Sequence, residues 1–496
     1  MENNTRKQIF YRGLLKSCNY SCTYCPFSRH FSKRELEEDA VGLERFVKAV
    51  EQMTGVGAVL VTPYGEALIH EYYWKAMAAL SRLPWVELVG CQTNLSFPVE
   101  HMLDVFQKAG GNRKKLRLWC TFHPTMVSSE SFLAQCTLLE RKHVAFCVGS
   151  VGVPGHREIL IQLRERLPEA VYMWVNPIDG LKRKYTKEEI AGFAKIDPFF
   201  PYLLKRTKAQ WAQCKGCLGE AMFVHFNGDV TACNLSRKKL GNLYRSRDFA
   251  TAATTVEGSN CGSRECSCYL AYSNRLDQPE LACFGKYPAF RMGQIPQAMF
   301  LDVDGTLVKE GCEGVDDKIA GQLAYWSQYT EIYLATSLHL AHAMKKCHAV
   351  KPFLSGGVFA NGGIISLFQE KKTWIIAIEQ EILQLLLQIF QSFPIHVRTY
   401  RQEGKVYKIT AIGERSTEVY DILQKEVSAW GKESAVTIVL EGKHIEITGC
   451  GADKLAGVQQ ICEYCGYHRD KILVAGDSEN DRPMLEYFAM AVKRHG

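Results

Sequence analysis

Short apolar runs alternate with longer amphipathic stretches along the first 200 residues of the chain. The runs are rich in β-branched and aromatic residues, which is typical of buried strands. They occupy residues 8–13, 57–61, 86–91, 116–121, 144–150 and 171–175. The stretches between them repeat apolar residues at a spacing of three or four, which predicts helices. These stretches occupy residues 41–53, 72–83, 99–110, 129–142 and 157–167.

Strands that alternate with helices predict a parallel sheet, because parallel neighbours need a crossover connection. The six runs favour an α/β fold in the form of a partial (β/α)6 barrel of the TIM type. In such a barrel, the loops after the carboxyl ends of the strands carry the chemistry. We therefore expect functional side chains directly after each run.

The pattern changes twice further along the chain. A cysteine-rich region follows residue 200, and its Asn227-Gly228 pair between two apolar runs predicts a β-hairpin. Residues 285–297 contain Pro, Gly and Gln and predict a linker, after which an apolar run opens a new α/β domain. The predicted domains are residues 1–200, 201–290 and 296–496.

Composition and charge exclude several classes of protein. The chain of 496 residues has 47% hydrophobic and 23% charged residues and no apolar run long enough to span a membrane. Its start lacks the apolar core of a secretory signal, so we expect a cytoplasmic protein with no membrane partner. There, the 19 cysteines would be reduced thiols or metal ligands. A net charge of +7 is mild, and the basic clusters lack interleaved aromatic residues, so no nucleic-acid partner is expected.

Three cysteines lie close together in the loop expected after the first strand: Cys18, Cys22 and Cys25. Three thiolates from one loop can hold three irons of a [4Fe–4S] cluster and leave the fourth iron open to a small molecule. The alternative is a zinc site with His30 as a fourth ligand, since cysteine and histidine at short spacing often bind zinc.

The spacing of these cysteines, with Tyr24 before the last one, resembles the signature of the radical S-adenosylmethionine (SAM) superfamily. In that family SAM chelates the open iron, and its reductive cleavage releases a 5′-deoxyadenosyl radical. Gly65-Glu66 after the second run resembles the segment that binds the methionyl amino group, with Tyr64 in place of a glycine.

The third and later runs also end in polar residues. Thr93-Asn94 is similar to the strand end that lies near the SAM ribose in the same family. His123 and Asn176 follow the fourth and sixth runs. Each would face the cavity, and contact with substrate and a structural hydrogen bond remain equally open for both.

The second cysteine region resembles the SPASM/twitch extension that holds auxiliary [4Fe–4S] clusters in many radical-SAM enzymes. The resemblance rests on the spacing of Cys217, Gly228 and Cys233. It implies one auxiliary cluster held by Cys217, Cys233, Cys266 and Cys268, with Cys214, Cys261 and Cys283 as further candidates. The downstream pair is Cys-x-Cys where the family commonly has Cys-x2-Cys, and a zinc ribbon remains an alternative.

The apolar run that opens the last domain leads into Asp302 and Asp304, followed by a turn at Gly305. Asp302 is placed to attack a phosphorus atom, and Asp304 to protonate the leaving group and deprotonate water. Carboxylates this close need a cation, and Mg²⁺ would also neutralise phosphoryl oxygens. The run resembles the first motif of the haloacid dehalogenase (HAD) superfamily, and its second aspartate favours phosphatases or phosphomutases.

Three further motifs follow in the order of that family. Thr336 ends a strand with a hydroxyl for the phosphoryl group, and Lys454 is placed to stabilise the charge of the pentacoordinate state. Another apolar run ends in acids, of which Asp477 would bind Mg²⁺ and Asp481 would support the site. The expected magnesium residues are Asp302, Asp304, Asp477 and Asp481.

The long segment between Thr336 and Lys454 resembles the position at which Cof-like HAD phosphatases insert an α/β C2 cap. The resemblance implies a Rossmann-like core with this cap at about residues 365–448. Two features depart from the family. Leu338 stands where Cof-like members often carry arginine, and the chain stops soon after Asp481, which predicts a shortened last strand and helix.

Together the resemblances imply a bifunctional enzyme. Its N-terminal part would begin radical chemistry on a small molecule, such as a phosphorylated sugar, cyclitol or nucleotide, with electrons from a flavodoxin or ferredoxin. Its C-terminal part would hydrolyse a phosphate ester with Mg²⁺, and tethering would raise the local concentration of the intermediate. The alternative is a radical-SAM enzyme that modifies a peptide or protein and carries an accessory HAD domain. A third hypothesis, a zinc-dependent interaction or nucleic-acid module, requires zinc at both cysteine regions and a vestigial HAD site.

Overall fold

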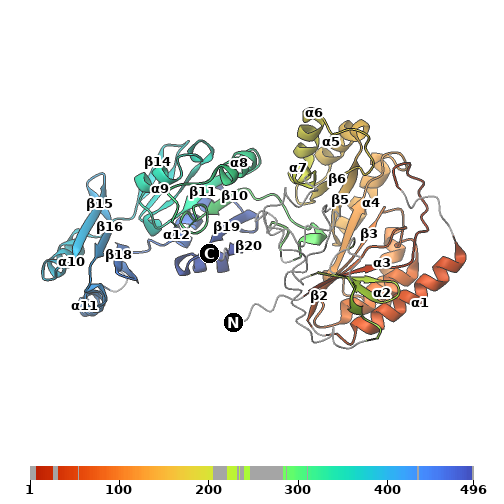
Figure 1. Ribbon diagram of the computed structural model, residues 1–496, viewed down its shortest axis with the longest axis horizontal. Helices are drawn as coiled ribbons and strands as arrows, with labels where there is room; N and C mark the ends of the chain where they lie inside the picture. Colours follow the sequence, from red (N-terminus) through yellow and green to blue (C-terminus); the bar gives the residue numbers. More distant parts are fainter. Residues whose placement is uncertain are drawn as a thin grey trace. The chain divides into compact units, whose positions relative to one another are not determined.

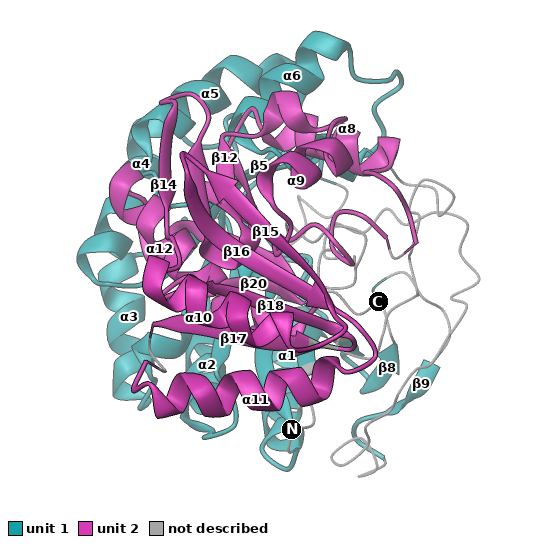
Figure 2. Cartoon of the chain, turned by 90° about the vertical axis from the view of Figure 1, so that its left-hand side faces the viewer, with its two compact units in different colours: residues 1–294 teal, residues 295–496 magenta. Residues whose placement is uncertain are grey.

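The computed structural model divides the chain into two compact units, Met1–Gln294 and Ile295–Gly496 (Figure 2). Each unit has its own sheets and its own hydrophobic core. The residues that the structure describes are 7–25, 32–53, 55–204, 221–231, 234, 239–245, 283–285, 287–309, 311–432 and 435–493.

Six parallel strands run in chain order across the sheet of the first unit, which confirms the predicted parallel sheet. They are β1 (Lys7–Arg12), β2 (Val56–Val61), β3 (Leu88–Thr93), β4 (Leu116–Thr121), β5 (Ala145–Gly152) and β6 (Met173–Pro177). The carboxyl ends of all six therefore meet at one edge of the sheet.

A hairpin extends this sheet beyond β1. Strand β7 (Ala221–His225) pairs in parallel with β1, and β8 (Asp229–Thr231) and β9 (Lys239–Asn242) follow in antiparallel order. Gly228 has φ +85° at the turn, which confirms the hairpin predicted from Asn227-Gly228. The pairing covers the edge of β1 that would otherwise expose unpaired backbone groups.

Helices cover one face of this sheet (Figure 1). The crossovers hold α1 (Lys33–Val50), α2 (Glu71–Arg82), α3 (Val99–Lys108), α4 (Ser129–Arg141) and α5 (Arg157–Arg166), and α6 (Lys187–Ile196) and α7 (Phe200–Leu203) follow β6. The predicted start of the first helix at residue 41 is wrong, because Ser32 caps α1 through the N–H of Glu35 and the first turns are polar. No helix in the described part of the chain is long and apolar enough to cross a membrane.

The opposite face of the sheet is covered by residues that were predicted as part of the linker. The guanidinium of Arg291 lies over the rings of Trp119 and Trp174, at 4.8 and 4.9 Å from their centroids. The Tyr287 hydroxyl donates to Glu87 at 3.0 Å. Arg291 is 1% exposed, so this segment is part of the first unit rather than a solvated linker.

The second unit contains a seven-stranded sheet with the Rossmann-like arrangement expected for this region. Its order is β14-β13-β12-β11-β10-β19-β20, and only the β12-β13 and β13-β14 pairs are antiparallel. The strands are β10 (Ala298–Leu301), β11 (Glu331–Ala335), β12 (Gly356–Phe359), β13 (Ile364–Leu367), β14 (Lys372–Ile375), β19 (Ile472–Gly476) and β20 (Met490–Lys493). The helices packed with them are α8 (Asp317–Trp326), α9 (Leu340–Lys346), α12 (Lys454–Cys465) and α13 (Arg482–Tyr487).

A four-stranded antiparallel sheet is inserted between β14 and α12. Its order is β15-β16-β18-β17, and α10 (Gln380–Gln391) and α11 (Ser416–Ala429) pack on it through a separate apolar core (Figure 2). The strands are β15 (His396–Gln402), β16 (Lys405–Ile412), β17 (Val436–Glu441) and β18 (His444–Gly449). We call this insertion the cap. It begins after Ile375 and not near residue 365, because β13 and β14 pair with the core sheet.

Candidate functional site

Three carboxylates meet at the carboxyl ends of β10 and β19 in the second unit. Asp302 follows β10, Asp477 follows β19, and the two strands are parallel neighbours. Oxygen atoms of Asp302, Asp477 and Asp481 all lie within 4.8 Å of one another. Mg²⁺ prefers such hard oxygen ligands, so this set fits the ion that the sequence predicted.

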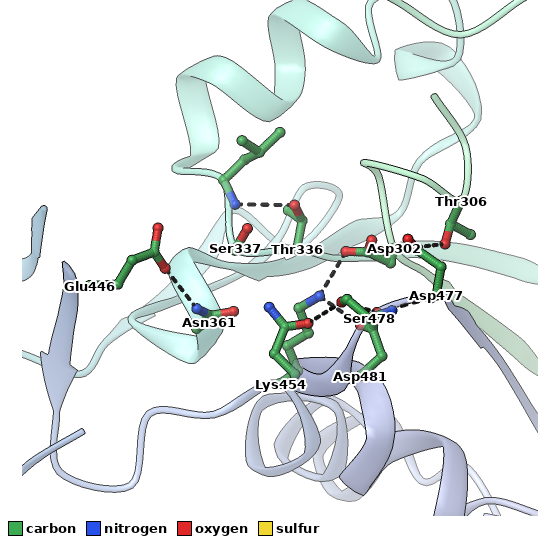
Figure 3. A network of polar contacts seen from close by, with 12 residues as sticks. Asp302, Thr306, Thr336, Ser337, Asn361, Glu446, Lys454, Asp477, Ser478 and Asp481 are labelled. Atoms are coloured by element: carbon green, nitrogen blue, oxygen red, sulfur yellow. Dashed lines mark hydrogen bonds and ion pairs between the residues drawn. The ribbon is translucent and has the colours of Figure 1, made fainter. Parts of the chain in front are cut away.

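Lys454, the first residue of α12, holds two of these acids. Its ammonium donates to Asp302 at 2.7 Å and to Asp481 at 2.6 Å, and all three side chains are buried (Figure 3). Burial lowers the pKa of Lys454, but the charges of Asp302 and Asp481 outweigh it, so the pKa lies above its usual value. Burial also raises the pKa of Asp302 to about 7, although Lys454 acts in the opposite direction.

Asp481 has a second role as an organiser of the turn after β19. Its Oδ2 accepts the backbone N–H groups of Asp477 and Ser478, at 3.1 Å each, and the Ser478 hydroxyl at 2.8 Å. This is a capping box at the start of a short 3-10 turn. Asp481 therefore positions Asp477, as the sequence predicted for a supporting residue.

The loop after β10 closes on Asp477. The Thr306 hydroxyl donates to Asp477 at 2.9 Å. Gly305 has φ +76°, and a Cβ there would lie 2.0 Å from an oxygen of Asp477, so only glycine fits. Asp304, in contrast, is 47% exposed, and its carboxylate is paired with Lys346 of α9 rather than with the other acids. The structure thus separates the side chain of Asp304 from those of the other three predicted magnesium residues, Asp302, Asp477 and Asp481.

Thr336 follows β11 and is held by the loop around it. Its hydroxyl accepts the N–H of Leu338 at 3.1 Å, and its carbonyl accepts the N–H of Asn361 at 3.1 Å. The cap reaches the same loop, because Lys408 of β16 donates to the carbonyl of Ser337 at 2.8 Å. The first predicted phosphate contact is therefore tied both to the core and to the cap.

Several side chains near this site were not singled out from the sequence. Lys346 faces Asp304, and Lys408 pairs with Glu446 of β18 at 2.7 Å. Glu446 also accepts the Asn361 amide at 3.0 Å. Asn361 had a signal, since an Asn-Gly-Gly stretch predicts a turn. No sequence pattern marked Lys346, Lys408 or Glu446, because their interaction partners are remote in the sequence.

The cysteine loop of the first unit follows β1, as predicted. Its turn is closed by a hydrogen bond from the N–H of Cys25 to the carbonyl of Cys22, at 3.1 Å. Burial raises the pKa of Cys18 to about 11 and also raises the pKa of Cys22. Burial therefore favours the protonated thiols, and a metal ion bound here would have to displace their protons.

The loops after β2 and β3 contact the cysteine loop. A Cβ at Gly65 would lie 2.0 Å from the carbonyl oxygen of Ser17, and the Glu66 N–H donates to that same oxygen at 3.0 Å. Asn94 donates from its side-chain amide to Asn19 at 3.0 Å. Residues predicted at three separate strand ends are thus neighbours.

Glu66 is buried and forms hydrogen bonds within this group. It accepts the Thr93 hydroxyl and the Asn94 N–H, each at 2.6 Å, and the Leu68 N–H at 3.0 Å. Burial raises its pKa to about 7, against the effect of these three donors. Glu66 therefore organises the loops after β2 and β3 in this structure.

His123 lies at the cysteine loop. Its Nδ1 is 2.8 Å from the Tyr24 hydroxyl and 3.4 Å from Cys22 Sγ. Burial lowers the pKa of His123 to about 4, so the ring is neutral at pH 7. Asn176, within β6, accepts a hydrogen bond from Nη1 of Arg291 at 3.1 Å. The predicted auxiliary ligands Cys217, Cys233, Cys266 and Cys268, with Cys214, Cys261 and His30, lie outside the described residues, and Cys283 is buried.

Comparison with known proteins adds to the geometry of the second unit. A family model described as haloacid dehalogenase-like hydrolase matches residues 299–429 and 402–493. The C-terminal part of the chain is therefore a haloacid dehalogenase-like hydrolase domain. No curated protein matches the chain.

Three similar solved structures each cover about 40% of this chain. A Thermotoga maritima protein has 18% identity and a TM-score of 0.35, over 40% of this chain and 86% of its own. A haloacid dehalogenase-like hydrolase from Bacteroides thetaiotaomicron has 17% identity and a TM-score of 0.34, over 39% and 86%. A HAD subclass IIB sugar phosphatase has 15% identity and a TM-score of 0.34, over 40% and 86%.

Proposed function

We propose that the second unit hydrolyses phosphate monoesters with Mg²⁺. The observation that carries this proposal is the buried group of Asp302, Asp477, Asp481 and Lys454. Mg²⁺ held by Asp302 and Asp477 would neutralise the phosphoryl oxygens. The buried ammonium of Lys454 keeps Asp302 oriented and supplies positive charge beside the developing phosphoryl charge.

The residues divide the reaction into two displacements. An Asp302 oxygen attacks phosphorus while the ester oxygen leaves with a proton from Asp304, and the phosphate is then carried as an acyl phosphate on Asp302. Asp304 next takes a proton from water, which attacks the same phosphorus and releases inorganic phosphate.

A phosphatase screen tests this proposal. Wild-type chain and Asp302→Asn are assayed on a panel of phosphorylated sugars, cyclitols and nucleotides, with Mg²⁺ or with a chelator. We expect Mg²⁺-dependent release of phosphate that the variant lowers by at least about 10³-fold, because it lacks the nucleophile. Equal inactivity of both chains on every ester would remove the support for the proposal.

We further propose that the first unit is a radical-SAM enzyme that acts on the same small molecule before or after the phosphate is removed. Cys18, Cys22 and Cys25 would hold the [4Fe–4S] cluster, and Gly65, Glu66, Thr93 and Asn94 would bind SAM beside it. When bound, the cluster would supply the electron that cleaves SAM to a radical. What supports the proposal is that the loops after β2 and β3 both contact the loop that carries the three cysteines, at Ser17 and at Asn19.

Anaerobic reconstitution tests the radical half. We expect about eight irons per chain if the auxiliary cluster of the second cysteine region is also present, and about four in a Cys18→Ala/Cys22→Ala/Cys25→Ala variant. The reduced wild-type protein should cleave SAM to 5′-deoxyadenosine, and the variant should not. Stoichiometric zinc in place of iron would contradict the proposal.

A further inference from the structure

The turn between β12 and β13 holds an asparagine in an unusual backbone conformation. Ala360 has φ +53° and Asn361 has φ +50°, the left-handed region, which is unfavourable for alanine and which asparagine tolerates. Gly362 lets the turn approach the residue before Lys454, since a Cβ there would lie 2.5 Å from the carbonyl oxygen of Asp453. The turn is thus wedged against the loop that leads to the buried lysine.

Two hydrogen bonds fix the orientation of Asn361. Its backbone N–H donates to the carbonyl of Thr336 at 3.1 Å, and its side-chain nitrogen donates to Glu446 of the cap at 3.0 Å. The other carboxylate oxygen of Glu446 accepts Lys408 at 2.7 Å. Because the amide nitrogen must face the carboxylate, the amide oxygen is held on the opposite side.

That oxygen, Asn361 Oδ1, is buried and has no hydrogen-bond partner among the described residues. Figure 3 shows it directed away from Glu446, on the side where Thr336 and Lys454 lie. A buried acceptor without a donor costs about 1–3 kcal/mol, and such atoms are rare in folded proteins. A strained backbone at Ala360 and an unsatisfied polar atom at the neighbouring Asn361 together indicate a binding role.

We propose that Asn361 Oδ1 accepts a hydrogen bond from a hydroxyl group on the leaving group of the phosphate ester. The inference rests on the proposed phosphatase function and narrows its substrate class to phosphate esters whose leaving group carries a hydroxyl group near the ester. The donor must lie close to the ester, because Asn361 is bonded to the backbone of Thr336, the proposed phosphoryl contact. An analogue without the hydroxyl leaves the acceptor desolvated and unpaired, so the site discriminates against it.

A pair of esters that differ in hydroxyl groups tests the inference: sn-glycerol 3-phosphate and n-propyl phosphate. The informative variant is Asn361→Gly, because glycine adopts the left-handed conformation without strain and keeps the turn. We expect kcat/KM for glycerol 3-phosphate to fall by roughly 10- to 100-fold, and that for propyl phosphate to change by less than about twofold. Asn361→Ala should show the same selectivity together with a lower Tm.

Equal falls on both esters, or no fall on either, would overturn the inference, because Asn361 would then act on the fold or not at all. Hydrolysis of p-nitrophenyl phosphate by wild type but not by Asp302→Asn tests the phosphatase function separately, since this ester carries no hydroxyl group. A chain that hydrolyses p-nitrophenyl phosphate and shows no preference for glycerol 3-phosphate over propyl phosphate overturns the inference alone.

Discussion

At the scale of single residues, Lys454 supplies the positive charge that stabilises the buried carboxylates of Asp302 and Asp481 in the second unit. Lys454 is 3% exposed, and its ammonium is bonded to both Asp302 and Asp481. Without it, two buried carboxylates would repel each other across a short distance. The lysine therefore stabilises the metal-free site, besides the catalytic role proposed for it.

Replacing Lys454 with methionine tests this role. We expect Lys454→Met to lose about 3–5 kcal/mol of unfolding free energy in the presence of a chelator, because it leaves two buried charges unpaired. The double variant with Asp302→Asn should recover part of that loss, and Mg²⁺ should recover part of it in the single variant. Urea unfolding measures the stability of the wild type, of the double variant, and of the single variant with a chelator and with Mg²⁺. A single variant as stable as the wild type would contradict the assignment.

Glu66 predicts how the stability of the first unit depends on pH. Burial raises its pKa from 4.5 to about 7, so the folded state holds this proton more tightly than the unfolded state. The stabilising contribution is complete below pH 4.5 and is lost as pH rises to 7. Between pH 5 and 8, the wild type should lose about 2–3 kcal/mol more than Glu66→Gln. Urea unfolding at both pH values checks this, and parallel losses would contradict the burial of a titrating Glu66.

Residues at strand ends could be predicted from the sequence, and residues that come from the cap could not. Asp302, Thr336 and Asp477 each follow an apolar run, so parallel pairing alone brings them together. Lys408 and Glu446 reach the site from antiparallel strands inserted more than sixty residues after Thr336. No local pattern indicates which face of the cap meets the core, so their contacts emerge only in the folded chain.

At the scale of elements, the approach of the loop after β2 to the cysteine loop depends on Gly65. Any side chain there would collide with the backbone carbonyl of Ser17. We expect Gly65→Ala to lose about 1–3 kcal/mol of unfolding free energy and to incorporate less iron on reconstitution, because the two loops are forced apart. Gly155→Ala is the matched control, since a Cβ at Gly155 meets no atom within 4 Å. Equal iron content in the two variants would contradict this account.

The segment around Arg291 gives a second prediction at this scale. Phe284 and Phe290 are buried with Arg291, and the Phe284 ring packs edge-on against Tyr172 at 4.8 Å. A chain that ends at residue 282 would expose Trp119 and Trp174, so we expect a lower Tm than for a chain that ends at residue 294. Tryptophan fluorescence during heating measures both. Identical transitions would show that the segment is dispensable.

This segment also shows a limit of pattern analysis. The composition of residues 285–297 is that of a linker, and the segment has no period of two or four that would predict burial. Its aromatic side chains are buried because the sheet face opposite the helices offers two tryptophans and Asn176. The strand order and the position of the hairpin could be predicted from local sequence signals. The burial of this segment could not, because it depends on a complementary surface formed by residues elsewhere in the chain.

At the scale of the whole molecule, two units with separate cores share one chain. The α/β class of both, the parallel sheet of the first and the Rossmann-like sheet of the second were predictable from alternating runs. The start of the cap could not be predicted. Strands β13 and β14 lie where the sequence predicted the cap to begin, but they pair with the core sheet. The account depends most on Asp302 acting as a nucleophile in the second unit.

Covalent labelling tests that claim most directly. Wild type and Asp304→Asn are mixed with ³²P-labelled p-nitrophenyl phosphate and Mg²⁺, quenched in acid and digested. Because p-nitrophenol leaves without a proton, Asp304→Asn should still form the acyl phosphate but hydrolyse it slowly. The account predicts label on the peptide that contains Asp302, with a larger amount in Asp304→Asn than in wild type. Release of phosphate with no label on Asp302, or with label on another residue, would contradict it.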